Sequence, residues 1–291
     1  QYLVNGRCYS MATGQILLPS MKTDPWAMQT DDEREWLEII EHRKAYRIAD
    51  ISKVRVGIKT TADSVFIRTD WDSLPMRSRP ENELLRPLLS HDDAARWRSL
   101  AADKPCRSVL YTHENRSGKR VAIELQQFSR TAAYLESHRK GLEGRNYIRE
   151  ANRLWYDVWV PQDPDAWKLP KLVFPDISPT AKFFYDPNGC IVDGNCYWIT
   201  ALNGVDDEAL FLIMAVANSR LMTRYHDLAF QNKLYAGRRR HLTQYVERYP
   251  LPDLNSDEGN QLIVLGKSLA MDRLTPDKEK EIEEEIEGLV A

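Results

Sequence analysis

Cationic and hydroxyl side chains accompany a short β-branched run early in the sequence. The run occupies residues 51–56 and ends at Gly57. The side chains are Arg55, Lys59, Thr60 and Thr61. Hydroxyls, exposed backbone N–H groups and a lysine together suit an oxyanion such as a phosphate. A β-hairpin with an ordinary solvated loop has the same pattern, so this stretch is either an anion-binding loop or such a hairpin.

Basic charge is concentrated in parts of the chain. The net charge is −3, but residues 218–250 hold seven Lys or Arg against two acids, and residues 107–153 hold ten against five. Residues 277–287 hold seven acids against two lysines. Clustered cations, more than net charge, are typical of nucleic-acid-binding proteins. The densest cluster follows Gly237 and consists of Arg238, Arg239 and Arg240, with Lys233 just before it.

Several other classes of site find little support. The four cysteines form no C-x-x-C pair and have no histidine at ligand spacing, so we expect reduced thiols and no metal site. A Mg²⁺-dependent nuclease needs clustered Asp and Glu-x-Lys residues, which Glu124-Leu-Gln does not match. The chain starts at Gln1 without a leader sequence or a long apolar run, so we expect a cytoplasmic protein with no membrane partner.

Hydrophobic periodicity predicts an α+β fold, with mixed and antiparallel strands followed by C-terminal helices. Helices are expected over residues 31–47, 131–145, 206–222 and 260–273, with the acidic tail as a solvated helix. Strands are expected over residues 51–56, 65–67, 108–111, 121–125, 169–175, 181–185, 190–193 and 196–200. The turn 113–120 carries three cations and is either a DNA-contacting loop or a solvated hairpin tip.

Several sequence blocks occur in a recognisable order along residues 46–270. They are Ile48–Thr60 with Val65–Ile67, Tyr134-Leu135 ahead of Leu142 and Arg145, Trp155-Tyr156, Pro170–Phe174, Phe184–Asp186 with Cys196–Thr200, Leu212–Ala217 with Asn218-Ser219-Arg220-Leu221, the Gly237 loop, and Tyr249-Pro-Leu-Pro252. This succession resembles the C-terminal target-recognition (specificity) domain of TaqI-like adenine-specific DNA methyltransferases of restriction–modification systems. No single block is specific, so the ordered set carries the resemblance.

The resemblance implies a DNA-recognition domain whose catalytic domain lies elsewhere. The family's catalytic half carries an Asn/Asp-Pro-Pro-Tyr/Phe motif and a Gly-rich turn for S-adenosylmethionine. The chain has no G-x-G, and Asp186-Pro-Asn-Gly lacks the second proline and the aromatic residue. We therefore expect no Rossmann-like catalytic domain, no catalytic residue and no cofactor in this chain, with S-adenosylmethionine bound by a missing catalytic domain. Thr60-Thr61 stands where the family often has Thr-Gly, and Pro-Leu-Pro where it often has Pro-Ile-Pro.

The resemblance also implies an organisation and a partner. Residues 1–45 would lead from an upstream methyltransferase domain, residues 46–253 would recognise double-stranded DNA, and residues 254–291 would form C-terminal helices with the acidic tail. The DNA-facing residues would be Arg55, Lys59, Thr60, Thr61, Lys233, Arg238, Arg239 and Arg240. Arginines can pair with guanine or hold phosphates. The alternative for the arginine triplet is a solvated loop or bridges to the acidic tail.

The function implied is sequence-specific DNA recognition within an adenine-specific methyltransferase or a bifunctional restriction–modification enzyme. The first alternative is a stand-alone specificity subunit that works with a separate methylase. Such a subunit would need a docking surface, either on helix 31–47 with Trp36, Ile39 and Ile40 or on the final helices. The second alternative is a purely structural module, which would show no salt-dependent affinity for DNA.

Overall fold

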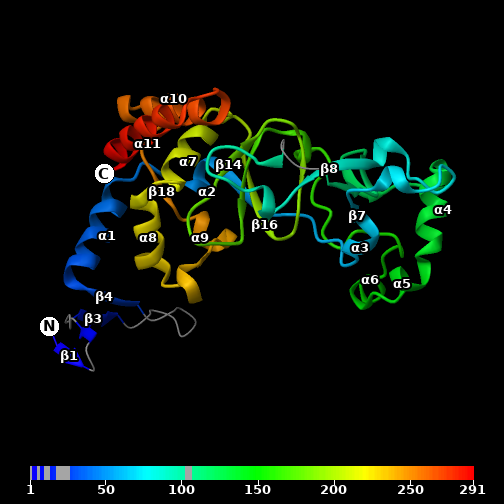
Figure 1. Cartoon of the computed structure of the whole chain (residues 1–291), viewed down its shortest axis with the longest axis horizontal. Helices are drawn as coiled ribbons and strands as arrows, with labels where there is room; N and C mark the ends of the chain where they lie inside the picture. The colour runs from blue at the N-terminus through cyan, green and yellow to red at the C-terminus, as the bar shows by residue number, and fades with distance from the viewer. Residues whose placement is uncertain (1, 5–6, 10–13, 18–26, 102–106) are drawn as a thin grey trace.

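A four-stranded antiparallel sheet lies at the centre of the computed structural model, which describes residues 2–4, 7–9, 14–17, 27–101 and 107–291 (Figure 1). Its strands are, in order, β14 (Phe184–Asp186), β12 (Lys171–Pro175), β16 (Cys196–Ala201) and β6 (Ser52–Val56). Successive side chains of a strand point to opposite faces. Leu172 and Phe174 accordingly face one hydrophobic core and Val173 faces a second. The sheet is therefore buried on both sides, which explains its continuous apolar runs.

Helices cover the first core. They are α1 (Asp31–Arg43), α2 (Ile48–Ile51), α7 (Ala209–Ala217), α8 (Arg220–Phe230), α9 (Thr243–Val246), α10 (Asp257–Met271) and α11 (Pro276–Val290). Every residue of α7 is buried. Helix α10 packs closely on α7 at Gly266, where an added Cβ would lie 2.6 Å from the carbonyl oxygen of Phe211. Apolar residues of α10 and α11 belong to this core, so the C-terminal helices share it with the central sheet.

The second core lies on the opposite face of the central sheet, under a mixed four-stranded sheet. Its strands are β15 (Ile191–Val192), β8 (Leu85–Leu89), β9 (Ser108–Leu110) and β7 (Ile67–Arg68), of which β15 and β8 are parallel. The hairpin β10 (His113–Arg116)–β11 (Lys119–Ala122) follows, and then α4 (Ser129–Ser137), α5 (Arg139–Glu143) and α6 (Asn146–Glu150). Figure 1 shows these three helices at the end of the molecule farthest from α1 and α8.

Short strand pairs complete the described structure. Near the N-terminus, β1 (Tyr2–Val4) pairs with β2 (Arg7–Tyr9), and β3 (Gly14–Leu17) pairs with β4 (Ala27–Thr30). Elsewhere β5 (Tyr46–Arg47) pairs with β18 (Pro250–Leu251), and β13 (Ile177–Ser178) pairs with β17 (Arg239–Arg240). None of the helices in the described ranges is long and apolar enough to cross a membrane.

The α+β class is confirmed, but several of the predicted elements are wrong. The predicted helix 131–145 is two helices, α4 and α5, and the tail predicted as a solvated helix buries Ile282 and Ile286 in the first core. Residues 63–66 form a helical turn, α3 (Asp63–Phe66), and β6 and β7 belong to different sheets, so the predicted hairpin around residues 57–62 does not exist. The predicted helix 206–222 is two helices, because the Ser219 hydroxyl accepts a hydrogen bond from the Met222 N–H and caps α8. Residues 85–89, which are not among the predicted strands, form strand β8.

Candidate nucleic-acid interface

Both predicted cationic segments leave the central sheet at the same end. β16 begins at Cys196, whose carbonyl accepts a hydrogen bond from the Gly57 N–H (2.9 Å), at the end of β6. On the other side of β16, the Asp176 N–H donates to the carbonyl of Asn195 (3.0 Å), just after β12. β13 follows at once and pairs with β17, which belongs to residues 231–240, here called the Gly237 loop. Because neighbouring strands lie about 4.8 Å apart, the strand ends leading to the two segments are on the order of 10 Å apart.

The Gly237 loop is a narrow turn at the C-terminal end of α8. The Leu234 N–H donates to the carbonyl of Arg238 (2.8 Å), and Lys233 pairs with Arg239 as an isolated bridge. The chain reverses at Ala236 and Gly237, whose φ angles are +55° and +69°. Positive φ suits glycine and is strained for alanine. In Figure 1 this loop continues from the lower end of α8, below α9.

Two arginines of this loop are engaged by carboxylates. Arg239 meets Asp227 of α8 through Nε and Nη2, at 2.6 and 2.7 Å from the two carboxylate oxygens. Arg240 meets Asp176 in the same two-point manner, at 3.2 and 3.3 Å. Lys233 lies 3.3 Å from Asp227. The fold thus brings these three predicted DNA-facing residues together. Asp227 and Asp176, and not the acidic tail, partly neutralise their charge.

Arg238 differs from its two neighbours. Its guanidinium carbon lies 4.3 Å from the ring centre of Tyr235, which is 78% exposed. Within the part of the chain that the structure describes, Arg238 has no ion pair, and its buried Nε has no hydrogen-bond partner. The loop tip therefore presents one cation stacked on one exposed aromatic ring.

A buried polar network supports the loop from α8. His226 bonds Asn232 through Nε2 (2.8 Å) and Tyr249 through Nδ1 (2.7 Å), and the Asn232 side chain donates to the carbonyl of Arg240 (2.7 Å). His241 lies against Tyr249, with its Nδ1 3.3 Å from the hydroxyl oxygen. Burial lowers the pKa of His226 to about 4 and that of His241 to about 3, so both are neutral at physiological pH.

The segment after β6 places only some of its predicted residues at the surface. Lys59 is exposed, and its backbone N–H and C=O both pair with Val160 (3.1 and 3.0 Å). Thr60 is 1% exposed, and its hydroxyl donates to Asp63. Thr61 is exposed at φ +58°, and its hydroxyl donates to the carbonyl of Thr60 (2.6 Å). The structure thus leaves Lys59 and Thr61 accessible and buries Thr60.

Arg55 lies on the central sheet itself. Its guanidinium carbon lies 4.7 Å from the ring centre of Trp198, and Nη1 donates to the Thr200 hydroxyl (2.8 Å). Burial lowers the pKa of Arg55, with Asp163 acting in the opposite direction. An arginine remains protonated at neutral pH all the same. Arg55 is therefore a half-buried cation near the end of β6, held by the Trp198 ring and the Thr200 hydroxyl.

Backbone pairing of Lys59 with Val160 brings in residues that were not predicted to face DNA. Arg153 donates to the carbonyl of Trp159 (2.7 Å), with its guanidinium carbon 4.8 Å from the centre of that ring. Tyr147, which is 60% exposed, lies on Trp159 at a centroid distance of 5.6 Å. The sequence feature that pointed toward this region is the cationic turn 113–120. Arg120 of that turn donates to the carbonyl of Gln162 (3.2 Å), shortly after Trp159 in the sequence.

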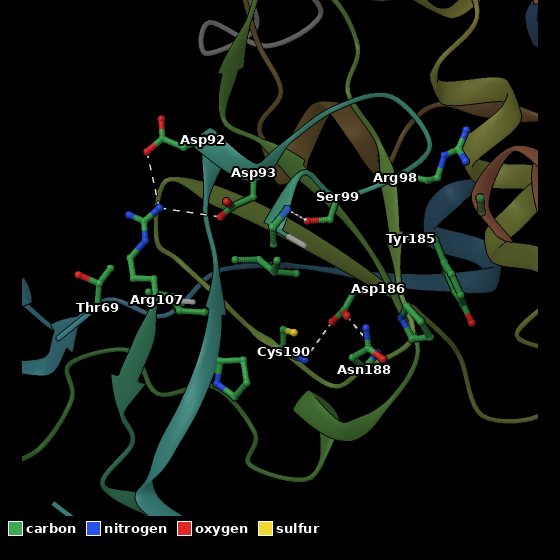
Figure 2. Close-up of a pocket in the computed structure, with 16 residues that line it drawn as sticks. Thr69, Asp92, Asp93, Arg98, Ser99, Arg107, Tyr185, Asp186, Asn188 and Cys190 are labelled. Atoms are coloured by element: carbon green, nitrogen blue, oxygen red, sulfur yellow. Dashed lines mark hydrogen bonds and ion pairs between the residues drawn. The ribbon is translucent and has the colours of Figure 1, made fainter. Parts of the chain in front are cut away.

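A cavity of about 930 Å³ lies at the opposite end of the central sheet, beside Asp186 (Figure 2). Its arginines are paired: Arg107 with Asp92 and Asp93, at 3.6 and 3.9 Å, and Arg98 with Glu279. The paired charges give it little capacity for an anion. No group of three or more His, Cys, Asp or Glu side chains among the described residues could hold a metal ion.

No protein-family model matches the chain. It is 46% identical, over 288 residues, to the Type II methyltransferase M.BanIII of Aneurinibacillus aneurinilyticus, a match covering 99% of this chain and 50% of that protein. It is 25% identical, over 246 residues, to M.BstVI of Geobacillus stearothermophilus, covering 82% of this chain and 41% of that protein. The chain therefore spans half the length, or less, of these relatives.

A solved structure shares the fold. It is that of the Type IIL restriction-modification enzyme MmeI in complex with DNA, with a TM-score of 0.57 and 13% identity, covering 85% of this chain and 33% of that one. At this identity the match concerns the fold alone. The sequence comparisons thus relate the chain to Type II methyltransferases. The structural comparison shows that a similar fold occurs in the restriction–modification enzyme MmeI.

Proposed function

We propose that this chain is the part of an adenine-specific DNA methyltransferase, or of a bifunctional restriction–modification enzyme, that recognises the target sequence in duplex DNA. The observation that carries the proposal is the shared edge of the central sheet, where β6 and β12 end on either side of the start of β16. This arrangement sets Lys59 and the Gly237 loop on one edge, although they are far apart in sequence. The relatives, which are Type II methyltransferases, and the DNA in the MmeI complex support the same proposal.

The two segments suit different tasks on a duplex. Lys59 is an exposed point charge without an ion pair among the described residues, which suits a phosphate oxygen. An arginine offers two parallel N–H donors, which match the O6 and N7 atoms of guanine in the major groove. Phosphate contacts fix the register of a protein on DNA, and base contacts supply specificity. A lysine and an arginine loop on one edge could perform both tasks.

We propose that S-adenosylmethionine, the methyl donor of such enzymes, binds to another part of the protein. The sequence holds no G-x-G turn, and the arginines of the cavity beside Asp186 are paired with carboxylates. Enzymes that modify a base also need a closed pocket for the extruded nucleotide. We therefore assign methyl transfer, and the choice of adenine, to the rest of the protein and derive no catalytic step here.

A stand-alone specificity subunit is the second candidate. Its predicted docking surface on α1 is only partly available, because Ile39 is 43% exposed while Trp36 and Ile40 pack against the first core. Both candidates need a methyltransferase domain to bind nearby, on the same chain or on a separate one. The coding sequence upstream of Gln1 separates them: an Asn-Pro-Pro-Tyr motif in the same reading frame would support the single-chain enzyme.

Fluorescence anisotropy with labelled duplex DNA across a salt series tests the proposal. We expect affinity to fall as salt rises, with a log–log slope of about −0.9 for each phosphate neutralised. Lys59→Ala should reduce the magnitude of that slope by about one such unit. Arg43→Ala, which removes an exposed cation at the end of α1, is the matched control and should leave the slope unchanged. Absence of any affinity at low salt would refute the proposal.

A further inference from the structure

The three consecutive arginines of the Gly237 loop have different surroundings. We infer that Arg238, supported by Tyr235, is the residue that reads a base pair, whereas Arg239 and Arg240 are positioning residues that fix the loop. This inference rests on the proposed function and adds to it the identity of one specificity-determining residue.

Arg239 has no free donor edge to offer to a base. Nε and Nη2 face Asp227, and Nη1 donates to the carbonyls of Pro179 (2.6 Å) and Gly237 (3.2 Å). Only 13% of the Arg239 side chain is exposed. The two-point contact that guanine would require is the one that the carboxylate already makes.

Arg240 is held in a similar but looser way. Nε and Nη2 face Asp176, and its backbone pairs with Ile177 in the β13–β17 ladder. The Arg240 carbonyl also accepts the hydrogen bond from Asn232. Its side chain is 49% exposed, so it could approach a phosphate, but its donor edge is occupied. Arg240 thus joins the loop to the edge of the central sheet.

Arg238 keeps its two terminal Nη groups available, without a partner among the described residues, and its orientation is fixed. Stacking on Tyr235 restrains the plane of the guanidinium, which reduces the rotamer entropy lost when it forms hydrogen bonds. Among the described residues no carboxylate pairs with it, and its shielded Nε lacks an acceptor. Tyr235, at 78% exposure, places this stacked pair at the surface. A guanidinium fixed in plane and without an anion is suited to bidentate recognition of guanine.

Selection from a pool of random-sequence DNA duplexes, followed by sequencing, tests the inference. The wild-type chain should enrich a site that contains a guanine at one position. Arg238→Lys keeps the charge but loses the two-point geometry, so it should reduce the preference at that one position about tenfold and leave the salt slope unchanged. Arg239→Lys should lower the melting temperature and weaken binding to all sequences alike. Arg43→Ala again serves as the control.

Each outcome decides between the alternatives. If Arg238→Lys retains the wild-type preference at every position, Arg238 reads no base and the inference is wrong. It is also wrong if Arg239→Lys changes the preference at a single position while leaving the others intact. Wild-type binding without any sequence preference would overturn base reading by the loop. A wild-type chain that binds no duplex at all, even at low salt, would instead refute the proposed function itself.

Discussion

Arg239 and Asp227 form a bidentate ion pair that joins the Gly237 loop to helix α8, with N–O distances of 2.6 and 2.7 Å. Both side chains are mostly buried, at 13% and 21% exposure. The hydrogen bonds that Arg239 donates to Asp227 raise the pKa of Arg239 above its ordinary value. Lys233 shares the same carboxylate. The basic cluster seen in the sequence is therefore partly a set of anchors, and its capacity for DNA is smaller than a count of cations suggests.

Replacing this carboxylate should destabilise the fold. Asp227→Asn leaves Arg239 largely buried without its anion, so we expect a loss of about 1–3 kcal/mol in the free energy of unfolding, measured with urea at pH 7. Burial by itself raises the pKa of Asp227, but Arg239 and Lys233 outweigh it, and the net pKa is lowered. The stabilisation is therefore complete above the unfolded pKa of about 3.9 and is lost as the pH falls through the lower folded pKa. Equal urea midpoints for variant and wild type at pH 7 would contradict this.

The buried pair of Lys171 and Asp186 should be more sensitive still. Their charged atoms lie 3.1 Å apart at 0% and 3% exposure, at the start of β12 and the end of β14. Lys171→Met would leave the Asp186 carboxylate buried without its cation, and breaking a pair in this way costs about 3–5 kcal/mol. Urea denaturation measures the loss. Arg116→Met, in an exposed hairpin pair, is the control and should leave stability nearly unchanged; a similar loss in both variants would rule out burial as the cause.

Features with a local cause could be predicted from the sequence. A helix was expected to start at residue 31, and α1 starts there, with Thr30 as its cap and Glu33 completing a capping box. The apolar runs at 169–175 and 196–200 were expected to be strands and are β12 and β16. Caps and apolar runs depend on residues a few positions apart, so a single sequence contains them.

Features that depend on distant contacts could not be predicted. The burial of Thr60 follows from its bond to Asp63 and from the close approach of Gly57 to the backbone of Asp193, which together turn the chain into α3. The partners of Arg239 and Arg240 stand 12 and 64 residues away in sequence. No local pattern indicates such pairings, and they decide which of the predicted site residues remain available.

Buried histidines should make stability fall in mild acid. Burial lowers the pKa of His113 to about 3, of His226 to about 4 and of His241 to about 3. An unfolded histidine titrates near 6.5, so below that pH the unfolded state binds more protons than the folded state. The free energy of unfolding should therefore decrease as the pH falls from 6.5 toward the folded values, by up to about 1.4 kcal/mol per pH unit for each histidine.

Urea unfolding at pH 7.5, 6.0 and 5.0 measures this decline. His241→Phe removes one of the three titrating groups and keeps an aromatic ring in the first core, so its stability should fall less steeply with pH than that of the wild type. An unfolding free energy that is equal at pH 7.5 and pH 5.0 in the wild type would show that the histidines are not buried as the structure has them.

Gly57 should be irreplaceable at the shared edge. A Cβ at this position would lie 2.0 Å from the carbonyl oxygen of Asp193 and 2.5 Å from that of Val192, and neither backbone atom can move like a flexible side chain. Gly57→Ala should therefore cost about 1–3 kcal/mol or more and displace Lys59, which lowers the affinity for duplex DNA. Gly141→Ala is the matched control: it faces open space in α5 and should stabilise the chain by about 0.5–1 kcal/mol. Urea unfolding and anisotropy at low salt measure both effects. Wild-type stability and affinity in Gly57→Ala would mean that the edge tolerates a wider separation, and the position of Lys59 would then not depend on this contact.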